Sequence, residues 1–206
     1  MSKATHTDAM GSIQRGIKRT LDFVMSALGL ILLSPLFIII SVLMKFQGNG
    51  PIFFRQIRIG YKGKPFVILK FRTISKKTEK NTPQLIAKTS CKSSTPFEKF
   101  LREHHLDELP QLWNVLVGDM SLVGPRPERK YFIDKIMEHT DLYTVIYNMR
   151  PGLTSEATLY NGYTDTMEKM LKRLQMDISY FERRSLWLDF KIIIKTFVNI
   201  VSGNKF

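Results

Sequence analysis

Two adjacent acidic residues, Asp107 and Glu108, are the strongest chemical signal in this sequence. Pro110 follows them closely, which predicts that they lie at the start of a helix. The positive end of a helix dipole favours an ionised carboxylate and attracts phosphate. Asp107 is therefore a candidate nucleophile for phosphorus, and Glu108 and Asp107 are candidate ligands of Mg²⁺. The alternative reading is that Asp107 only caps the helix.

A second signal is Arg126, which lies between Pro125 and Pro127. Because two prolines stiffen the backbone, the direction of this guanidinium group is set in advance, and such a group can clamp a phosphate. A tight turn with a solvated arginine explains the same residues. Further cations that could serve a phosphate site are Lys70 and Arg72 at the end of a predicted strand, and Arg102 one helix before the acid pair.

Composition narrows the choice of function without fixing it. The chain has 206 residues, of which 44% are hydrophobic, and a formal charge of +13. It is long enough for one sizeable core, and its charge attracts nucleic acid, anionic lipid or a phosphorylated substrate. Cys91 is the only cysteine, so an intramolecular disulfide is excluded. The sequence contains no Walker A motif, dinucleotide fingerprint or Gly-x-Ser-x-Gly elbow, and no zinc-ligand spacing around its histidines.

Residues 23–44 form a nearly continuous apolar run of roughly 22 residues, close to the ~20 that cross a bilayer. Ser34 and Pro35 interrupt it near the middle, and proline predicts a kink there. Basic residues flank the run on both sides: Arg15, Lys18 and Arg19 before it, and Lys45, Arg55, Arg58, Lys62 and Lys64 after it. This distribution favours a helix–break–helix that enters the membrane and returns to the same face. A kinked transmembrane helix remains the alternative.

The rest of the chain reads as an α+β fold that is mostly helical. Residues 51–59 and 65–71 predict a short β-hairpin. Residues 75–95 are polar and predict a mobile loop. Helices are predicted from a capping box at Thr95 to about His104, from Asp107, over 132–147 and 167–174, and over 185–201 as an amphipathic interfacial or core helix. We therefore expect a membrane segment over residues 1–46 and a globular catalytic domain over residues 47–206.

Together these motifs closely resemble the bacterial sugar transferase family, the small monotopic phosphoglycosyl transferases. The resemblance runs from about residue 18 to the C-terminus. It rests on residues 70–73 (KFRT), 106–114 (LDELPQLWN), 118–127 (GDMSLVGPRP), 150–154 (RPGLT) and 177–180 (DISY), and on the Ser34-Pro35 break. After Thr154 many relatives continue Gly-Trp-Ala, whereas this chain has Ser-Glu-Ala, so the sugar is not predicted.

The resemblance implies a reaction and roles for individual residues. Family members transfer a phosphosugar from a nucleotide diphosphate sugar, here expected to be a UDP-sugar, to a polyprenyl (undecaprenyl) phosphate. They release the nucleoside monophosphate. By resemblance, Asp107 takes the phosphosugar and Glu108 helps to bind Mg²⁺. Residues that match phosphate- or carboxylate-contacting positions are Lys70, Arg102 and Arg126, with Arg150 as a weaker candidate.

The resemblance also implies a place in the cell. The re-entrant helix would lie in the bacterial cytoplasmic (inner) membrane, with the catalytic domain on the cytoplasmic face. The reaction would be the first membrane step of capsule, exopolysaccharide, lipopolysaccharide or glycoconjugate assembly. The expected partners are the nucleotide sugar, the polyprenyl phosphate and the lipid bilayer. We expect no nucleic-acid partner, and a homodimer stays open.

Two other functions compete with this one. A membrane-bound, Mg²⁺-dependent phosphatase or pyrophosphatase could use the same Asp107–Glu108 pair and would need no polyprenyl phosphate. A basic, non-enzymatic membrane adaptor would bind anionic lipid or nucleic acid through its lysines and arginines, and Asp107→Asn would leave it unharmed.

Overall fold

The computed structural model describes residues 6–47, 50–73, 95–162, 164 and 166–202. The predicted mobile loop lies outside these residues except for Thr95. The longer helices are α1 (Ser12–Leu32), α2 (Ser34–Phe46), α3 (Pro96–Glu103), α4 (Gln111–Val117), α5 (Lys130–Met137), α8 (Met167–Arg183) and α9 (Leu186–Val201). Shorter helices are η1 (Tyr61–Gly63), η4 (Leu106–Glu108), α6 (Tyr143–Ile146) and α7 (Glu156–Asn161). The strands are β1 (Phe53–Ile59), β2 (Pro65–Phe71), β3 (Ser121–Val123) and β4 (Gly152–Thr154), so the predicted mostly helical α+β class is confirmed.

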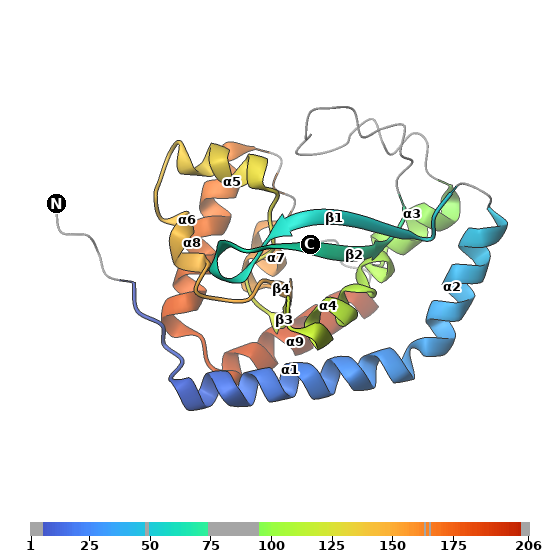
Figure 1. Ribbon diagram of the computed structural model, residues 1–206, viewed down its shortest axis with the longest axis horizontal. Helices are drawn as coiled ribbons and strands as arrows, with labels where there is room; N and C mark the ends of the chain where they lie inside the picture. The colour runs from blue at the N-terminus through green and yellow to red at the C-terminus, as the bar shows by residue number, and fades with distance from the viewer. Residues whose placement is uncertain (1–5, 48–49, 74–94, 163, 165, 203–206) are drawn as a thin grey trace.

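The N-terminal helices α1 and α2 form a bent pair along two edges of the molecule (Figure 1). Among the described residues no single helix is long and apolar enough to cross a membrane, but the pair passes that test together, with a bend of 57°. Pro35 falls in the first turn of α2, and the Ser34 hydroxyl donates to the carbonyl of Ile31 over 2.7 Å. The predicted break at Ser34-Pro35 is thus confirmed, and its freed carbonyl has a partner.

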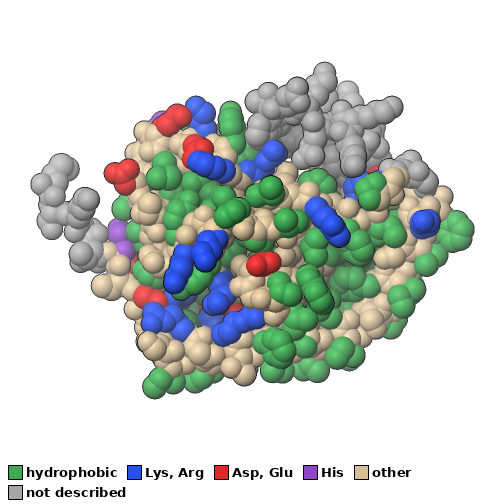
Figure 2. Space-filling model, in the orientation of Figure 1, with side chains coloured by type: hydrophobic (Ala, Val, Ile, Leu, Met, Phe, Trp, Pro, Cys, Tyr) green, Lys and Arg blue, Asp and Glu red, His purple; other side chains and the backbone are tan. Residues whose placement is uncertain are grey.

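Large apolar side chains remain exposed along this pair. Figure 2 shows hydrophobic side chains along the lower and right edges of the molecule, over α1 and α2. They include Phe23, Ile31, Leu32, Ile38, Ile39 and Phe46. A contiguous apolar surface of this kind marks a protein or membrane contact. Insertion into a membrane stays a prediction.

Polar contacts tie α1 to the globular part of the protein. The buried Asp22 carboxylate accepts hydrogen bonds from the Ser121 hydroxyl (2.7 Å) and from the next backbone amide (3.0 Å), both in β3. Arg19 donates to two carbonyls at the C-terminal end of α4, over 2.7 and 2.8 Å. Lys18 pairs with Asp189 of α9 at 2.5 Å. One helix of the bent pair is therefore bound to three elements of the globular part.

We expect Asp22→Ala to lower the free energy of unfolding by about 2–3 kcal/mol, because it leaves a partly buried backbone amide and the buried Ser121 hydroxyl without the Asp22 acceptor. The measurement is thermal unfolding of the full chain in detergent. Asp134→Ala is the matched control, since Asp134 lies on the surface of α5 in an i,i+4 pair with Lys130. Equal melting temperatures for the two variants would contradict the prediction.

The predicted hairpin β1–β2 is confirmed, although β1 begins at Phe53 rather than at residue 51. Its strands pair in antiparallel register from Phe53↔Phe71 to Ile59↔Pro65. Asn114 of α4 attaches the helix to this hairpin. Its side-chain amide donates to the carbonyl of Val67 (2.8 Å) and its oxygen accepts from the amide of Leu69 (3.0 Å). Because Lys70 follows immediately in β2, this contact also sets the place of Lys70 relative to the start of α4.

The core of the globular part lies between α5, α6, α8 and the short parallel pair β3–β4. Its buried members include Val123, Ile133, Ile136, Met149, Leu174 and Ile178. The parallel pair joins Ser121 to Gly152 and Val123 to Thr154, and it was not predicted from the sequence. These strands have three residues each, too few for a period-two pattern to be recognised.

Three helix limits differ from the predictions. No α-helix begins at Asp107: His105 takes a left-handed backbone conformation (φ 54°), the acid pair lies in the 3₁₀ turn η4, and α4 begins only at Gln111. Residues 132–147 form two helices, α5 and α6, separated by a turn in which the Thr140 hydroxyl accepts from the amide of Leu142. Helix α8 runs beyond residue 174 to Arg183, because its apolar face continues into the core.

Candidate active site

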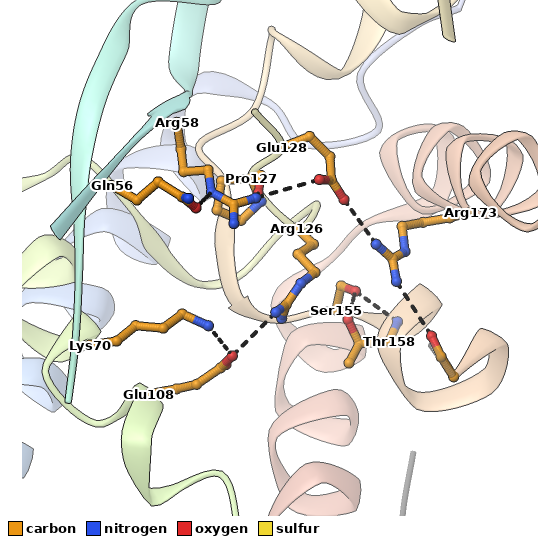
Figure 3. A network of polar contacts seen from close by, with 11 residues as sticks. Gln56, Arg58, Lys70, Glu108, Arg126, Pro127, Glu128, Ser155, Thr158 and Arg173 are labelled. Atoms are coloured by element: carbon orange, nitrogen blue, oxygen red, sulfur yellow. Dashed lines mark hydrogen bonds and ion pairs between the residues drawn. The ribbon is translucent and has the colours of Figure 1, made fainter. Parts of the chain in front are cut away.

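Glu108 is the centre of the candidate site (Figure 3). One of its carboxylate oxygens, Oε1, contacts Lys70 Nζ at 2.5 Å and Arg126 Nη2 at 3.2 Å. The three groups come from η4, from β2 and from the turn after β3. The structure therefore brings together one acid and two of the cations predicted for the site.

Charge rather than solvent sets the ionisation of Glu108. Burial alone would raise its pKa, but the positive charges of Lys70 and Arg126 outweigh burial and hold the pKa well below its usual range. The same pairing raises the pKa of Arg126. Glu108 and Arg126 are therefore charged at neutral pH, and the ion pairs of Glu108 hold Lys70 and Arg126 in place before any substrate binds.

Asp107 lies in a different environment from its neighbour. Its side chain is buried, and burial together with the charge of Glu108 raises its pKa to about 6, against the opposing effects of Lys70 and Arg126. It is therefore mostly ionised at neutral pH, with little water to stabilise its charge. A poorly solvated carboxylate beside cations has the properties expected of a nucleophile for a phosphate group.

The donor set can be compared with what Mg²⁺ requires. Among the described residues, no group of three or more His, Cys, Asp and Glu side chains could hold a metal. Mg²⁺ usually takes only one or two carboxylates and completes its shell with water and substrate phosphates, so Asp107 and Glu108 fit it. Asp107 fits better, because Oε1 of Glu108 already accepts from two cations.

The other predicted site residues have separate positions. Arg102 lies in the last turn of α3, immediately before the segment that leads to the acid pair. Arg72 is buried, with its guanidinium group directly against Gly50. Arg150 lies at the opposite end of α4 from the acids, where its Nε donates to the carbonyl of Gly118 over 2.9 Å. The structure does not bring Arg150 to the acid pair.

A network of charged residues behind Arg126 was not predicted from the sequence. Glu128 accepts from Arg173 Nη1 of α8 (3.0 Å) and lies 3.5 Å from Arg58 Nη1 of β1 (Figure 3). Arg58 Nη1 also donates to the carbonyl of Pro127 over 3.0 Å. Only Glu128 had a sequence signal, its place directly after the Gly-Pro-Arg-Pro turn, because the partners come from distant segments.

Asp177 of α8 adjoins this network in a small cavity that Arg126, Glu128 and Arg173 also line. Its side chain is buried, and burial, with smaller contributions from Glu128 and Glu156, raises its pKa to about 8 despite the nearby Arg173. Asp177 is therefore mostly protonated at neutral pH. Its only sequence signal was its place in the Asp-Ile-Ser-Tyr segment.

This pKa predicts an effect of pH on stability. The folded-state pKa of Asp177 lies above the ordinary aspartate value of 3.8, so the folded protein binds more protons and loses stability as the pH rises from about 4 to about 8. Asp177→Asn lacks this titration. From about pH 5 to pH 8 we expect wild type to lose roughly 2–4 kcal/mol relative to the variant. Thermal unfolding of both proteins across this range measures the difference, and parallel pH profiles would refute it.

A buried acid–cation cluster behind a bent apolar helix pair is the architecture expected of a membrane-associated enzyme that acts on phosphates. The model of the bacterial sugar transferase family matches residues 13–203, which include every site residue described above. The chain belongs to this family, as its motifs predicted.

Curated relatives agree with the family. The chain is 40% identical over 190 residues to the UDP-glucose:undecaprenyl-phosphate glucose-1-phosphate transferase of Klebsiella pneumoniae, covering 91% of this chain and 40% of the relative. An enzyme of that name in Caulobacter vibrioides is 40% identical over 188 residues, covering 90% and 70%. The UDP-N-acetylgalactosamine-undecaprenyl-phosphate N-acetylgalactosaminephosphotransferase of Aeromonas hydrophila is 35% identical over 203 residues, covering 96% and 48%. The chain thus spans less than half the length of the Klebsiella and Aeromonas proteins.

Proposed function

We propose that this protein transfers a sugar 1-phosphate from a UDP-sugar to undecaprenyl phosphate and releases UMP. Membership of the bacterial sugar transferase family and the names of its relatives support this reaction class. The observation that carries the proposal is the pairing of Glu108 with Lys70 and Arg126 beside the buried Asp107. That arrangement supplies a nucleophile and two fixed cations at one place.

The proposed reaction has two displacements at one phosphorus atom. A carboxylate oxygen of Asp107 attacks the phosphorus that bears the sugar. The bond from this phosphorus to the bridging oxygen breaks, and UMP leaves with the electron pair. A phosphate oxygen of undecaprenyl phosphate then attacks the same phosphorus and displaces Asp107. The products are an undecaprenyl diphosphate sugar and the regenerated carboxylate.

The cations and the acid pair have separate parts in these steps. Lys70 and Arg126 offset the negative charge that develops on the phosphate oxygens, and Glu108 holds them in place without competing as a nucleophile. Mg²⁺, when bound at Asp107 and Glu108, would supply further positive charge to the substrate phosphates.

The proposed location is the cytoplasmic membrane, with α1 and α2 entering and leaving on the cytoplasmic face. The exposed apolar side chains of this pair and its 57° bend support this arrangement. A single cysteine in place of Ser12 or Lys45, each in a Cys91→Ser background, tests it by labelling in intact cells. Labelling from one face supports re-entry, whereas labelling from opposite faces indicates a transmembrane helix.

The reaction is tested by measuring UMP release from detergent-solubilised protein, with a panel of UDP-sugars, Mg²⁺ and undecaprenyl phosphate. Release that requires the lipid supports the transferase and identifies the sugar. Release of more than one UMP per protein molecule without lipid indicates the phosphatase or pyrophosphatase instead, because the first displacement alone releases only one equivalent. If no donor yields UMP, the proposed reaction is wrong, and salt-dependent binding to anionic vesicles would then indicate the adaptor.

A further inference from the structure

We propose that Glu128 is a positioning residue for Arg126, an inference that rests on the proposed function. Glu128 follows the Gly-Pro-Arg-Pro turn and bridges Arg58 of β1 and Arg173 of α8, whereas Arg126 points from the same turn to Glu108 (Figure 3). Through this bridge, β1 and α8 set the direction of a guanidinium group that contacts the acid pair.

The backbone contacts show how the turn is held. The amide of Ile59 donates to the carbonyl of Glu128 over 3.1 Å, and Arg58 donates to the carbonyl of Pro127 over 3.0 Å. On the other side of Arg126, the carbonyl of Pro125 accepts from a β4 amide over 2.9 Å. The backbone is thus fixed before and after Arg126, and the later part of the turn depends on β1 and on the side chain of Glu128.

The side chain of Arg126 needs such support because packing alone does not enclose it. Its exposed fraction is 35%, against 13% for the Glu108 side chain that it contacts. The ion pair with Glu108 is a single contact at 3.2 Å rather than a bidentate one. A guanidinium group held by one hydrogen bond at a partly open surface moves readily when neighbouring charges change.

The position of Arg126 depends on the charge of Glu128, because Glu128 offsets the two neighbouring guanidinium groups. Burial lowers the pKa of Arg58 to about 10 and lowers that of Arg173, and in both cases the nearby charge of Arg126 lowers it further. The three guanidinium groups therefore repel one another. Asp177 is mostly protonated at neutral pH, so the negative charge of Glu128 balances Arg58 and Arg173. Removing that charge leaves two buried cations pushing against Arg126.

The first measurement compares turnover of the full chain in detergent for wild type, Glu128→Gln and Glu128→Gln/Arg173→Met. Glu128→Gln is expected to lower kcat about 10- to 100-fold, the usual effect of a misplaced catalytic group. Arg173→Met removes one repelling charge, so kcat of the double variant is expected to be at least about threefold higher than kcat of Glu128→Gln. Glu138→Gln is the control, since its exposed pair with Lys135 lies on α5 away from the site.

The second measurement does not depend on activity. The melting temperatures of Arg126→Met, Glu108→Gln and the double variant give the coupling between Arg126 and Glu108 as a departure from additivity. In the Glu128→Gln background, this coupling is expected to fall to less than half of its value in the protein with Glu128. Unchanged coupling, or a double variant with Arg173→Met that turns over no faster than Glu128→Gln, would overturn the proposal. If wild type releases no UMP, the proposed function fails and the coupling alone decides the role of Glu128.

Discussion

Asp107→Asn is expected to lower sugar-phosphate transfer by about a thousandfold or more, because an amide cannot form the covalent bond to phosphorus. The fold should not suffer. Burial and the charge of Glu108 raise the pKa of Asp107 to about 6, so the ionised side chain is unfavourable in the folded protein at neutral pH. An uncharged residue of the same shape removes this repulsion. The variant is therefore expected to melt no lower than wild type while being inactive.

The covalent step gives this prediction a direct readout. Wild type incubated with a UDP-sugar but without lipid should gain the mass of one sugar phosphate, and Asp107→Asn should not. Asp134→Asn, an exposed acid on α5, is the matched control and should behave as wild type in both assays. Full activity of Asp107→Asn would rule out the nucleophile and would favour a role for Asp107 in the η4 turn alone.

Gly152→Ala should cost more stability than any other substitution considered for this protein. The strands β3 and β4 approach so closely that a Cβ at Gly152 would lie 2.1 Å from the backbone nitrogen of Gly124 and 2.5 Å from its oxygen. Both neighbours are backbone atoms that cannot rotate away. We expect a loss of more than about 4 kcal/mol, with little folded protein recovered.

This strand pair matters to the site because Gly124 opens the Gly-Pro-Arg-Pro turn, two residues before Arg126. Thermal unfolding and the yield of folded protein in detergent measure the effect. Gly16→Ala provides the control: nothing lies within 4 Å of a Cβ there, and alanine in a helix adds up to about 1 kcal/mol. If Gly152→Ala and the control have the same melting temperature, the strands can move apart without loss of stability, and the prediction is wrong.

The features predicted from sequence are those that depend on neighbouring residues. The hairpin, the capping box at Thr95 and the break at Ser34-Pro35 each follow from a few adjacent side chains, and the structure confirms all three. The meeting of Lys70 and Arg126 with the acid pair was predicted through the family resemblance, because spacing alone cannot bring separate segments together.

The features that were missed depend on contacts between distant segments. Glu128 and Arg173 are 45 positions apart, and Asp22 and Ser121 are 99 apart. Local pattern carries no information about which of many charged side chains meet after the chain has folded. The same limit applies to Arg150, which the resemblance implied as a weaker candidate for phosphate contact. Its guanidinium group lies at the far end of α4 from the acid pair, 5.1 Å from the centre of the Tyr61 ring.

The attachment of α1 through Asp22, Arg19 and Lys18 limits how the N-terminal helices can be exchanged in engineered variants. An anchor that only held the enzyme at the bilayer could be exchanged for any other membrane helix. Here the helix also supplies the acceptor for a β3 amide and the cap for the last turn of α4, the helix that follows the acid pair. A chimera that replaced this proposed membrane anchor with a foreign helix would lack those bonds, so we expect that α1 is not an interchangeable module.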